Sequence, residues 1–122
     1  MMDYEFFTHE ELECKCGCKK AFMDAEFMKN LVALRRDLAF PFTITSGYRC
    51  PAHNRAVGGH PKSAHMQGRA VDIQATGLKA LALVTEAVEY HFNGVGVSQK
   101  GVHGRRFIHL DNTHDEATIW SY

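Results

Sequence analysis

The chain has 122 residues, of which 45% are hydrophobic, and its 14 basic side chains balance 14 acidic ones. This length and apolar content predict one domain, residues 1–122, that can fold without disulfide support. A net charge of zero does not fit the strongly basic surface of a nucleic-acid-binding protein, and no apolar run approaches the roughly 20 residues of a membrane span.

The N-terminal residues 1–13 are acidic and aromatic. They lack the basic n-region and the apolar h-region of a secretory signal peptide. We therefore expect synthesis in the cytoplasm, so that an external substrate would be reached only after release or delivery by other means.

Local patterns predict the first elements in chain order. Residues 8–11 read as a capping box that opens a short helical turn. Asp24 is a good N-cap for an amphipathic helix over residues 24–38. Alternation of apolar and polar side chains predicts a strand over residues 42–45, and the Gly- and Pro-bearing residues 46–63 read as a long polar loop.

The second half of the chain continues this mixture. Residues 69–74 read as a strand, and Thr76 could cap a second helix. The inner face of that helix is expected to carry Leu78, Leu81, Ala82, Thr85 and Val88. Residues 107–111 and 118–122 read as further strands after a turn at 93–94. Because helices and strands do not alternate regularly, we predict an α+β fold, an antiparallel sheet with helices packed on one side.

Histidine is unusually frequent, with eight in the chain. It is the commonest neutral metal ligand and the usual proton shuttle, so the count raises the expectation of a metal site without locating it. We expect His9, His60, His91 and His114 to lie on the surface.

The segment from His65 to Asp72 has the residue types of a metal site. On the predicted strand, Ala70 and Asp72 share one face, whereas Val71 and Ile73 point to the core. An aspartate in an otherwise apolar strand is costly unless it is paired or bound to a cation. The small side chain of Ala70 leaves space beside the carboxylate.

The strand over residues 107–111 repeats this pattern, with His109 and Asp111 on the face opposite the core. A single histidine on a strand is more often a packed or surface residue. If the two strands are neighbours, however, His65, Asp72 and His109 can converge. Two imidazoles and one carboxylate leave an open position on tetrahedral zinc for a water of lowered pKa, as in catalytic sites.

Two motifs resemble those of the zinc D-Ala-D-Ala carboxypeptidase family: Ser63-x-His65-x-x-Gly68-x-Ala70-x-Asp72 and Phe107-Ile108-His109-Leu110-Asp111. The closest similarity is to the small single-domain members that are often found in phages and prophages. Three further segments add to the resemblance, which spans about residues 6–122: Thr45-Ser46-Gly47-Tyr48-Arg49, Asn54-x-x-Val57-Gly58-Gly59 and Trp120-Ser121-Tyr122.

This resemblance implies the fold shared with the zinc-bearing signalling domain of hedgehog proteins. It implies that His65, Asp72 and His109 bind Zn2+, and that Arg49 points at the carboxylate or carbonyl of a peptide substrate. The expected activity is a metallopeptidase, a carboxypeptidase or endopeptidase of D,D or L,D type, that acts as a monomer on peptidoglycan stem peptides. The alternative is a non-catalytic, zinc-bearing module that docks on the cell wall or belongs to a virion.

The general base is less well defined by the motifs. Many relatives in the resembled family have an acid a few residues before the last histidine ligand, but residues 104–106 here are Gly-Arg-Arg. We rank Asp111 first as the base and His103 second. Asp111 could equally be a partner that orients a ligand histidine.

Four cysteines remain, namely Cys14, Cys16, Cys18 and Cys50. The spacing of the first three is tighter than that of a Cys-x-x-Cys zinc knuckle. They could be reduced thiols at the edge of the core, or one could form a disulfide with Cys50. A structural metal site, with His53 as a further ligand, is the third possibility.

Overall fold

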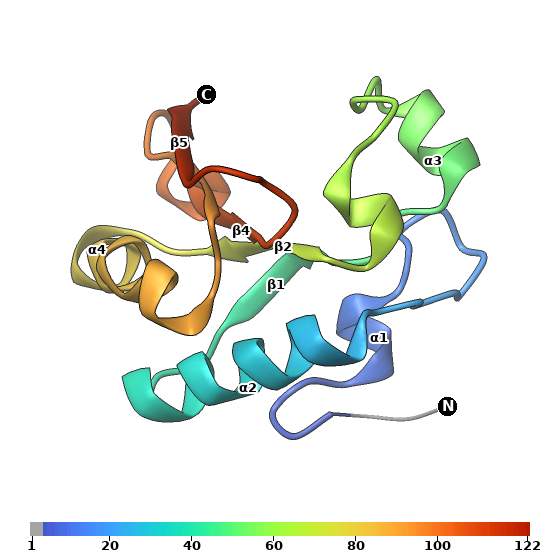
Figure 1. Ribbon diagram of the computed structural model, residues 1–122. Coiled ribbons are helices and arrows are strands. Elements are labelled where there is room, and N and C mark those ends of the chain that lie inside the picture. Colours follow the sequence, from blue (N-terminus) through green and yellow to red (C-terminus); the bar gives the residue numbers. More distant parts are fainter. Residues whose placement is uncertain (1–3) are drawn as a thin grey trace.

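The computed structural model describes residues 4–122, so the first three residues of the expected domain, 1–3, lie outside the described part. The strands form one five-stranded sheet with the order β1-β2-β4-β3-β5 (Figure 1). They are β1 (Thr43–Ser46), β2 (Ala70–Gln74), β3 (Gly94–Ser98), β4 (Phe107–Asp111) and β5 (Thr118–Ser121). All neighbouring strands are antiparallel except β3 and β5, which are parallel.

Two helices precede β1 in the chain, and the other helices and turns lie between strands. The helices are α1 (His9–Leu12), α2 (Ala25–Leu38), α3 (Pro51–Ala56) and α4 (Gly77–Glu86), with 3-10 turns η1 (Ala64–Gln67), η2 (Ala87–Tyr90) and η3 (His103–Arg105). The capping box between Thr8 and Glu11 opens α1, and the Asp24 carboxylate accepts the Phe27 N–H at 2.9 Å to open α2. Both helix starts were predicted, and the α+β class is confirmed.

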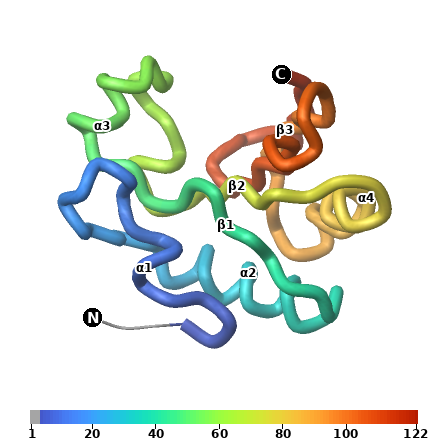
Figure 2. Tube along the Cα trace, turned by 180° about the vertical axis from the view of Figure 1, so that it is seen from behind, coloured from blue at the N-terminus to red at the C-terminus, as the bar shows by residue number. Residues whose placement is uncertain are grey.

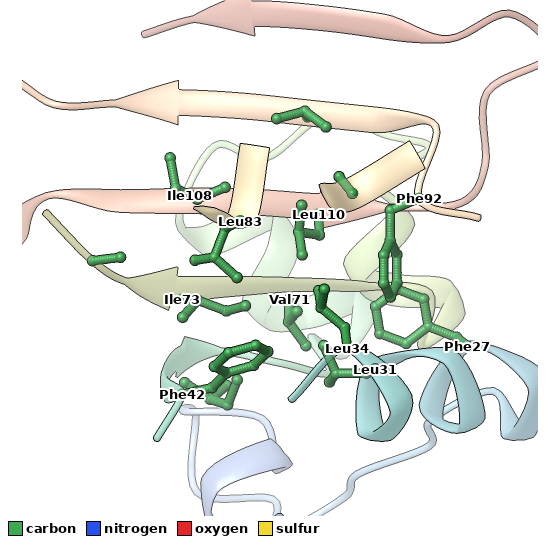
Figure 3. Close-up of a cluster of buried hydrophobic side chains, with 14 of the residues drawn as sticks. Phe27, Leu31, Leu34, Phe42, Val71, Ile73, Leu83, Phe92, Ile108 and Leu110 are labelled. Atoms are coloured by element: carbon green, nitrogen blue, oxygen red, sulfur yellow. The ribbon is translucent and has the colours of Figure 1, made fainter. Parts of the chain in front are cut away.

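The hydrophobic core lies between one face of the sheet and helices α2 and α4 (Figure 3). From the sheet it contains Val71, Ile73, Ile108 and Leu110, and from the helices Phe27, Leu31, Leu34 and Leu83. These eight side chains are fully buried, and each such burial contributes roughly 1.5–3 kcal/mol. Because side chains alternate along a strand, the opposite face of β2 and β4 is free to carry polar residues.

The expected loop over residues 46–63 was partly wrong, because it contains α3. Pro51 takes the first helical position, where its missing N–H costs no hydrogen bond. Cys50 precedes it, and its sulfur accepts the His53 N–H at 3.4 Å. Proline and glycine were read as loop signals, although proline is also common at a helix start.

The inner face predicted for α4 was also wrong. Leu78 and Leu81 are 84% and 57% exposed, whereas Ala80 and Leu83 are buried. Apolar residues surround this helix on most sides, so the helical period alone did not choose the face. Packing against the sheet makes that choice and buries Ala80 and Leu83. Within residues 4–122, no helix combines the length and the apolar character that crossing a membrane requires.

Candidate metal centre

Asp72 and His109 are direct partners across strands β2 and β4. Their side chains therefore leave the sheet on the same face, away from the core. The Nδ1 atom of His109 lies 2.9 Å from Oδ1 of Asp72. The assumption that the two motif strands are neighbours is thus confirmed.

His65 reaches this face from the 3-10 turn η1, just before β2. The Ser63 hydroxyl accepts the His65 N–H at 3.2 Å at the start of the turn. Gly68 ends it with φ at +67°, and a Cβ at Gly68 would collide with the carbonyl oxygen of Phe22. Only glycine fits this reversal, which brings Nε2 of His65 to 3.5 Å from Oδ1 of Asp72.

These three residues present one candidate ligand atom each, and the three atoms lie within 4.8 Å of one another. His65 and His109 are only 4% and 7% exposed, so the protein and not solvent surrounds most of each ring. Nε2 of His65 and Nδ1 of His109 both face the same carboxylate oxygen of Asp72. The three side chains therefore surround a common centre.

The outer nitrogens of the two imidazoles decide what this centre can bind. Nδ1 of His65 lies 2.8 Å from the Gly47 carbonyl, which can only accept, so this nitrogen carries the proton. In the neutral ring the lone pair of Nε2 would then face a carboxylate oxygen of Asp72, a contact that a cation between the two atoms would make favourable. Such a donor set, with the far nitrogens held by a carbonyl and a carboxylate, fits a divalent ion such as zinc.

The pKa values of Asp72 and His109 reflect the same crowding. Burial alone would raise the pKa of Asp72, but hydrogen bonds from His109 and His65 outweigh it and lower that pKa. Burial alone would lower the pKa of His109, but hydrogen bonds to Asp111 and Asp72 raise it to about 9. The site thus favours positive charge at its centre, which a metal ion supplies as well as a proton does.

Asp111 lies behind His109, away from the centre. Its Oδ2 is 2.7 Å from Nε2 of His109, and its Oδ1 accepts the N–H and the hydroxyl of Thr113, both at 3.1 Å. Burial would raise the pKa of this carboxyl, but the His109 and Thr113 hydrogen bonds lower it to about 2. Asp111 is 2% exposed, so it is an ionised, enclosed hydrogen-bond acceptor.

His114 belongs to the same network, although it was expected on the surface. Its Nδ1 lies 2.8 Å from Oδ1 of Asp111, and its ring packs at 5.5 Å from that of Trp120. Sequence reasoning missed it because residues 112–117, which contain it, have no helical or strand period that would orient side chains.

A cleft opens beside His109 on this face of the sheet. Its lining includes His60, Lys62, Ser63, His109, Asp111, His114 and Trp120. His103 instead lines the neighbouring hollow with Gln74, which shares the sheet face of Asp72. His114 therefore shares a cleft with His109, whereas His103 lines a hollow that contains none of the three candidate ligands.

Arg49 lies beside the turn that carries His65. Its backbone N–H donates to the His65 carbonyl at 3.1 Å, and its Nη1 donates to Oδ1 of Asn54 at 3.0 Å. The Asn54 side chain is buried and donates in turn to the His60 carbonyl at 2.9 Å. Helix α3, unexpected from the sequence, thus supplies the residue that orients the Arg49 guanidinium.

The sheet and the turn before β2 thus bring His65, Asp72 and His109 together as a candidate three-ligand metal site. On tetrahedral zinc such a set would leave one position for a non-protein ligand, as in catalytic sites. A family model described as Peptidase M15 matches residues 5–111. The chain therefore belongs to the M15 family of zinc D-Ala-D-Ala carboxypeptidases, as the motifs predicted. A search of curated proteins found no match to the chain. Trp120, on β5, lies beyond the matched range.

Proposed function

We propose that this protein hydrolyses peptide bonds next to D-amino acids in peptidoglycan stem peptides, with zinc held by His65, Asp72 and His109. The observation that supports it most strongly is the convergence of these three side chains beside a cleft in a member of a zinc peptidase family. Bound zinc would polarise the scissile carbonyl and lower the pKa of a water. The proposal treats residues 1–122 as one catalytic domain that works as a monomer.

Arg49 is the proposed substrate-binding residue. A guanidinium presents a planar set of N–H donors that suits a carboxylate or a polarised carbonyl. The hydrogen bond from its Nη1 to Asn54 occupies one of these donors and fixes the plane of the group. The remaining donors can then bind the C-terminal carboxylate of a stem peptide in a carboxypeptidase, or an internal carbonyl in an endopeptidase.

Asp111 is proposed as a positioning residue rather than the proton acceptor. Both of its oxygens are engaged by His109, Thr113 and His114, and it faces the far side of the His109 ring. A carboxylate in that position keeps the proton of His109 on Nε2 and leaves Nδ1 for a metal.

The proton acceptor is then proposed to be His114. It lines the same cleft as His109, and its Nδ1 is held by the Asp111 carboxylate. A histidine oriented by a carboxylate through one nitrogen can accept a proton from water at the other. His103, which the sequence had ranked as a candidate base, is the competing choice because it lies on the same sheet face next to Gln74.

The test is to incubate the zinc-loaded protein with purified peptidoglycan and to identify released products by mass spectrometry. Free alanine would define a carboxypeptidase, and larger peptide fragments an endopeptidase. His65→Asn should abolish release. The matched control is His91→Asn, because His91 is exposed and its left-handed backbone suits asparagine. A protein that pulls down with the wall and releases nothing would instead be the non-catalytic binding module.

A further inference from the structure

Four cysteine sulfurs gather at a second place in the molecule. Cys14, Cys16 and Cys18 come from the loop after α1, and Cys50 directly precedes α3 (Figures 1 and 2). In both views the loop passes beside the start of α3. The four Sγ atoms lie within 4.8 Å of one another, and those of Cys16 and Cys50 are 3.6 Å apart.

This spacing does not fit a disulfide but does fit four thiolates around one ion. A disulfide requires sulfurs about 2.05 Å apart, and all four cysteines are free. Tetrahedral zinc with Zn–S bonds of about 2.3 Å holds its sulfurs roughly 3.8 Å from one another. The 3.6 Å separation of the Cys16 and Cys50 sulfurs is close to that value.

The backbone around the cluster is arranged for thiolate charge. The Cys50 N–H donates to the Cys14 sulfur at 3.3 Å, and the His53 N–H donates to the Cys50 sulfur at 3.4 Å. Such donors stabilise a thiolate, since charge-assisted hydrogen bonds are stronger than neutral ones. His53, considered as a further ligand in one of the three interpretations, contributes its backbone N–H. Gly17, with φ at +94°, makes the turn that lets three alternate cysteines face one point.

We propose that Cys14, Cys16, Cys18 and Cys50 bind a second zinc ion, in a closed structural site separate from the catalytic centre. Four protein thiolates leave no position for water, which distinguishes it from the three-ligand site. The tight Cys-x-Cys-x-Cys spacing is compatible with this because residues 15–18 form a turn. Lysines 15, 19 and 20 place positive charge around a centre of net negative charge.

The second zinc would fasten the segment that serves the catalytic centre. Cys50 follows Arg49 in the chain, and the Gly47 carbonyl holds His65. The same segment is tied to the end of α1, where the Tyr48 N–H donates to the Leu12 carbonyl at 2.9 Å. Since metal binding contributes directly to folding free energy, this site would fix residues 47–50 that α1 and α3 hold from either side.

Metal counting separates the two sites. Purified protein, reduced and exchanged against buffered zinc, should hold two zinc ions per chain. The double variant Cys16→Ser/Cys18→Ser should hold one, and so should His65→Asn/His109→Asn. Lys15→Ser, an exposed change in the same loop, should still hold two. A wild-type count of one that the cysteine variant leaves unchanged would overturn the second site, whatever the outcome at the first.

Thiol reactivity tests the proposal in the unmodified protein, so it does not depend on variants that fold. The four thiols should resist a thiol reagent while zinc is bound, even though Cys16 and Cys18 are exposed. All four should react after a strong chelator removes the metal. Four thiols that react at the same rate with and without the chelator, or a disulfide found by mass spectrometry in the zinc-loaded protein, would contradict the site. With cobalt, the cysteine cluster should give the intense sulfur-to-metal charge-transfer absorption.

Discussion

The Asp111 carboxylate contacts Nε2 of His109 at 2.7 Å, on the side of the imidazole opposite the contact between Nδ1 and Asp72. Asp111 could orient His109 as a metal ligand, or it could be the general base, and these two roles predict different measurements. A residue that orients a ligand should affect metal binding, whereas a base should affect turnover alone.

Asp111→Asn should therefore weaken zinc binding at the catalytic centre by about 10- to 100-fold. The amide has only one acceptor oxygen and cannot satisfy His109, His114 and Thr113 together. Competition with a chelator measures the zinc affinity. Asp115→Asn, an exposed change nearby, is the control and should leave it unaltered. Unchanged affinity with a large loss of rate would identify Asp111 as the base instead.

His114→Gln should lower kcat by about 10²- to 10⁴-fold, the range typical of a lost general base. Zinc content should remain that of the wild type, because His114 is not one of the three candidate ligands. His103→Gln is the matched variant from the neighbouring hollow and should change kcat little. If His103→Gln lowers kcat strongly and His114→Gln changes it little, the proton acceptor is His103.

Arg49→Lys should raise KM more than it lowers kcat, with an overall loss in kcat/KM of about 10- to 100-fold. Lysine keeps the charge but loses the planar donor set that Asn54 orients, and a hydrogen bond to a charged group contributes about 1.5–3 kcal/mol. Steady-state kinetics on a stem peptide measures KM and kcat separately. Arg55→Lys, an exposed change on α3, serves as the control. Equal kinetics for both variants would remove Arg49 from the substrate-binding role.

Gly94→Ala should destabilise the protein by about 1–3 kcal/mol and weaken zinc binding. Gly94 faces Asp111 across strands β3 and β4, and a Cβ there would lie 2.5 Å from Oδ2 of Asp111 and from Nδ1 of His114. Denaturant unfolding measures the stability. The comparison is Gly104→Ala, whose Cβ would meet its nearest neighbour only at 3.8 Å. Equal stabilities of the two variants would show that the surroundings of Asp111 can accommodate a Cβ at position 94.

The sequence predicts that the three candidate ligands lie close together, because their positions follow simple rules. Strand alternation assigns Asp72 and His109 to the face opposite the core, and Gly68 marks the reversal after His65. Only the pairing of β2 with β4 had to be assumed, and the structure confirms it.

Other features depend on tertiary packing and were not foreseen. Leu78 and Leu81 on α4 were assigned to the inner face but are exposed. The assignment failed because apolar residues occur around most of that helix. His114 lies in an irregular segment without a period. The cysteine cluster is formed by parts of the chain far apart in sequence, so its spacing alone left three interpretations open.

The most direct test of the central claim is the release of alanine or peptide fragments from purified peptidoglycan as zinc is removed and returned. The wild type should release product, lose this activity on chelation and regain it with added zinc. Asp72→Asn should not regain it. Release at an undiminished rate from the chelated protein, or none from protein whose His65–Asp72–His109 centre is fully loaded with zinc, would contradict the account.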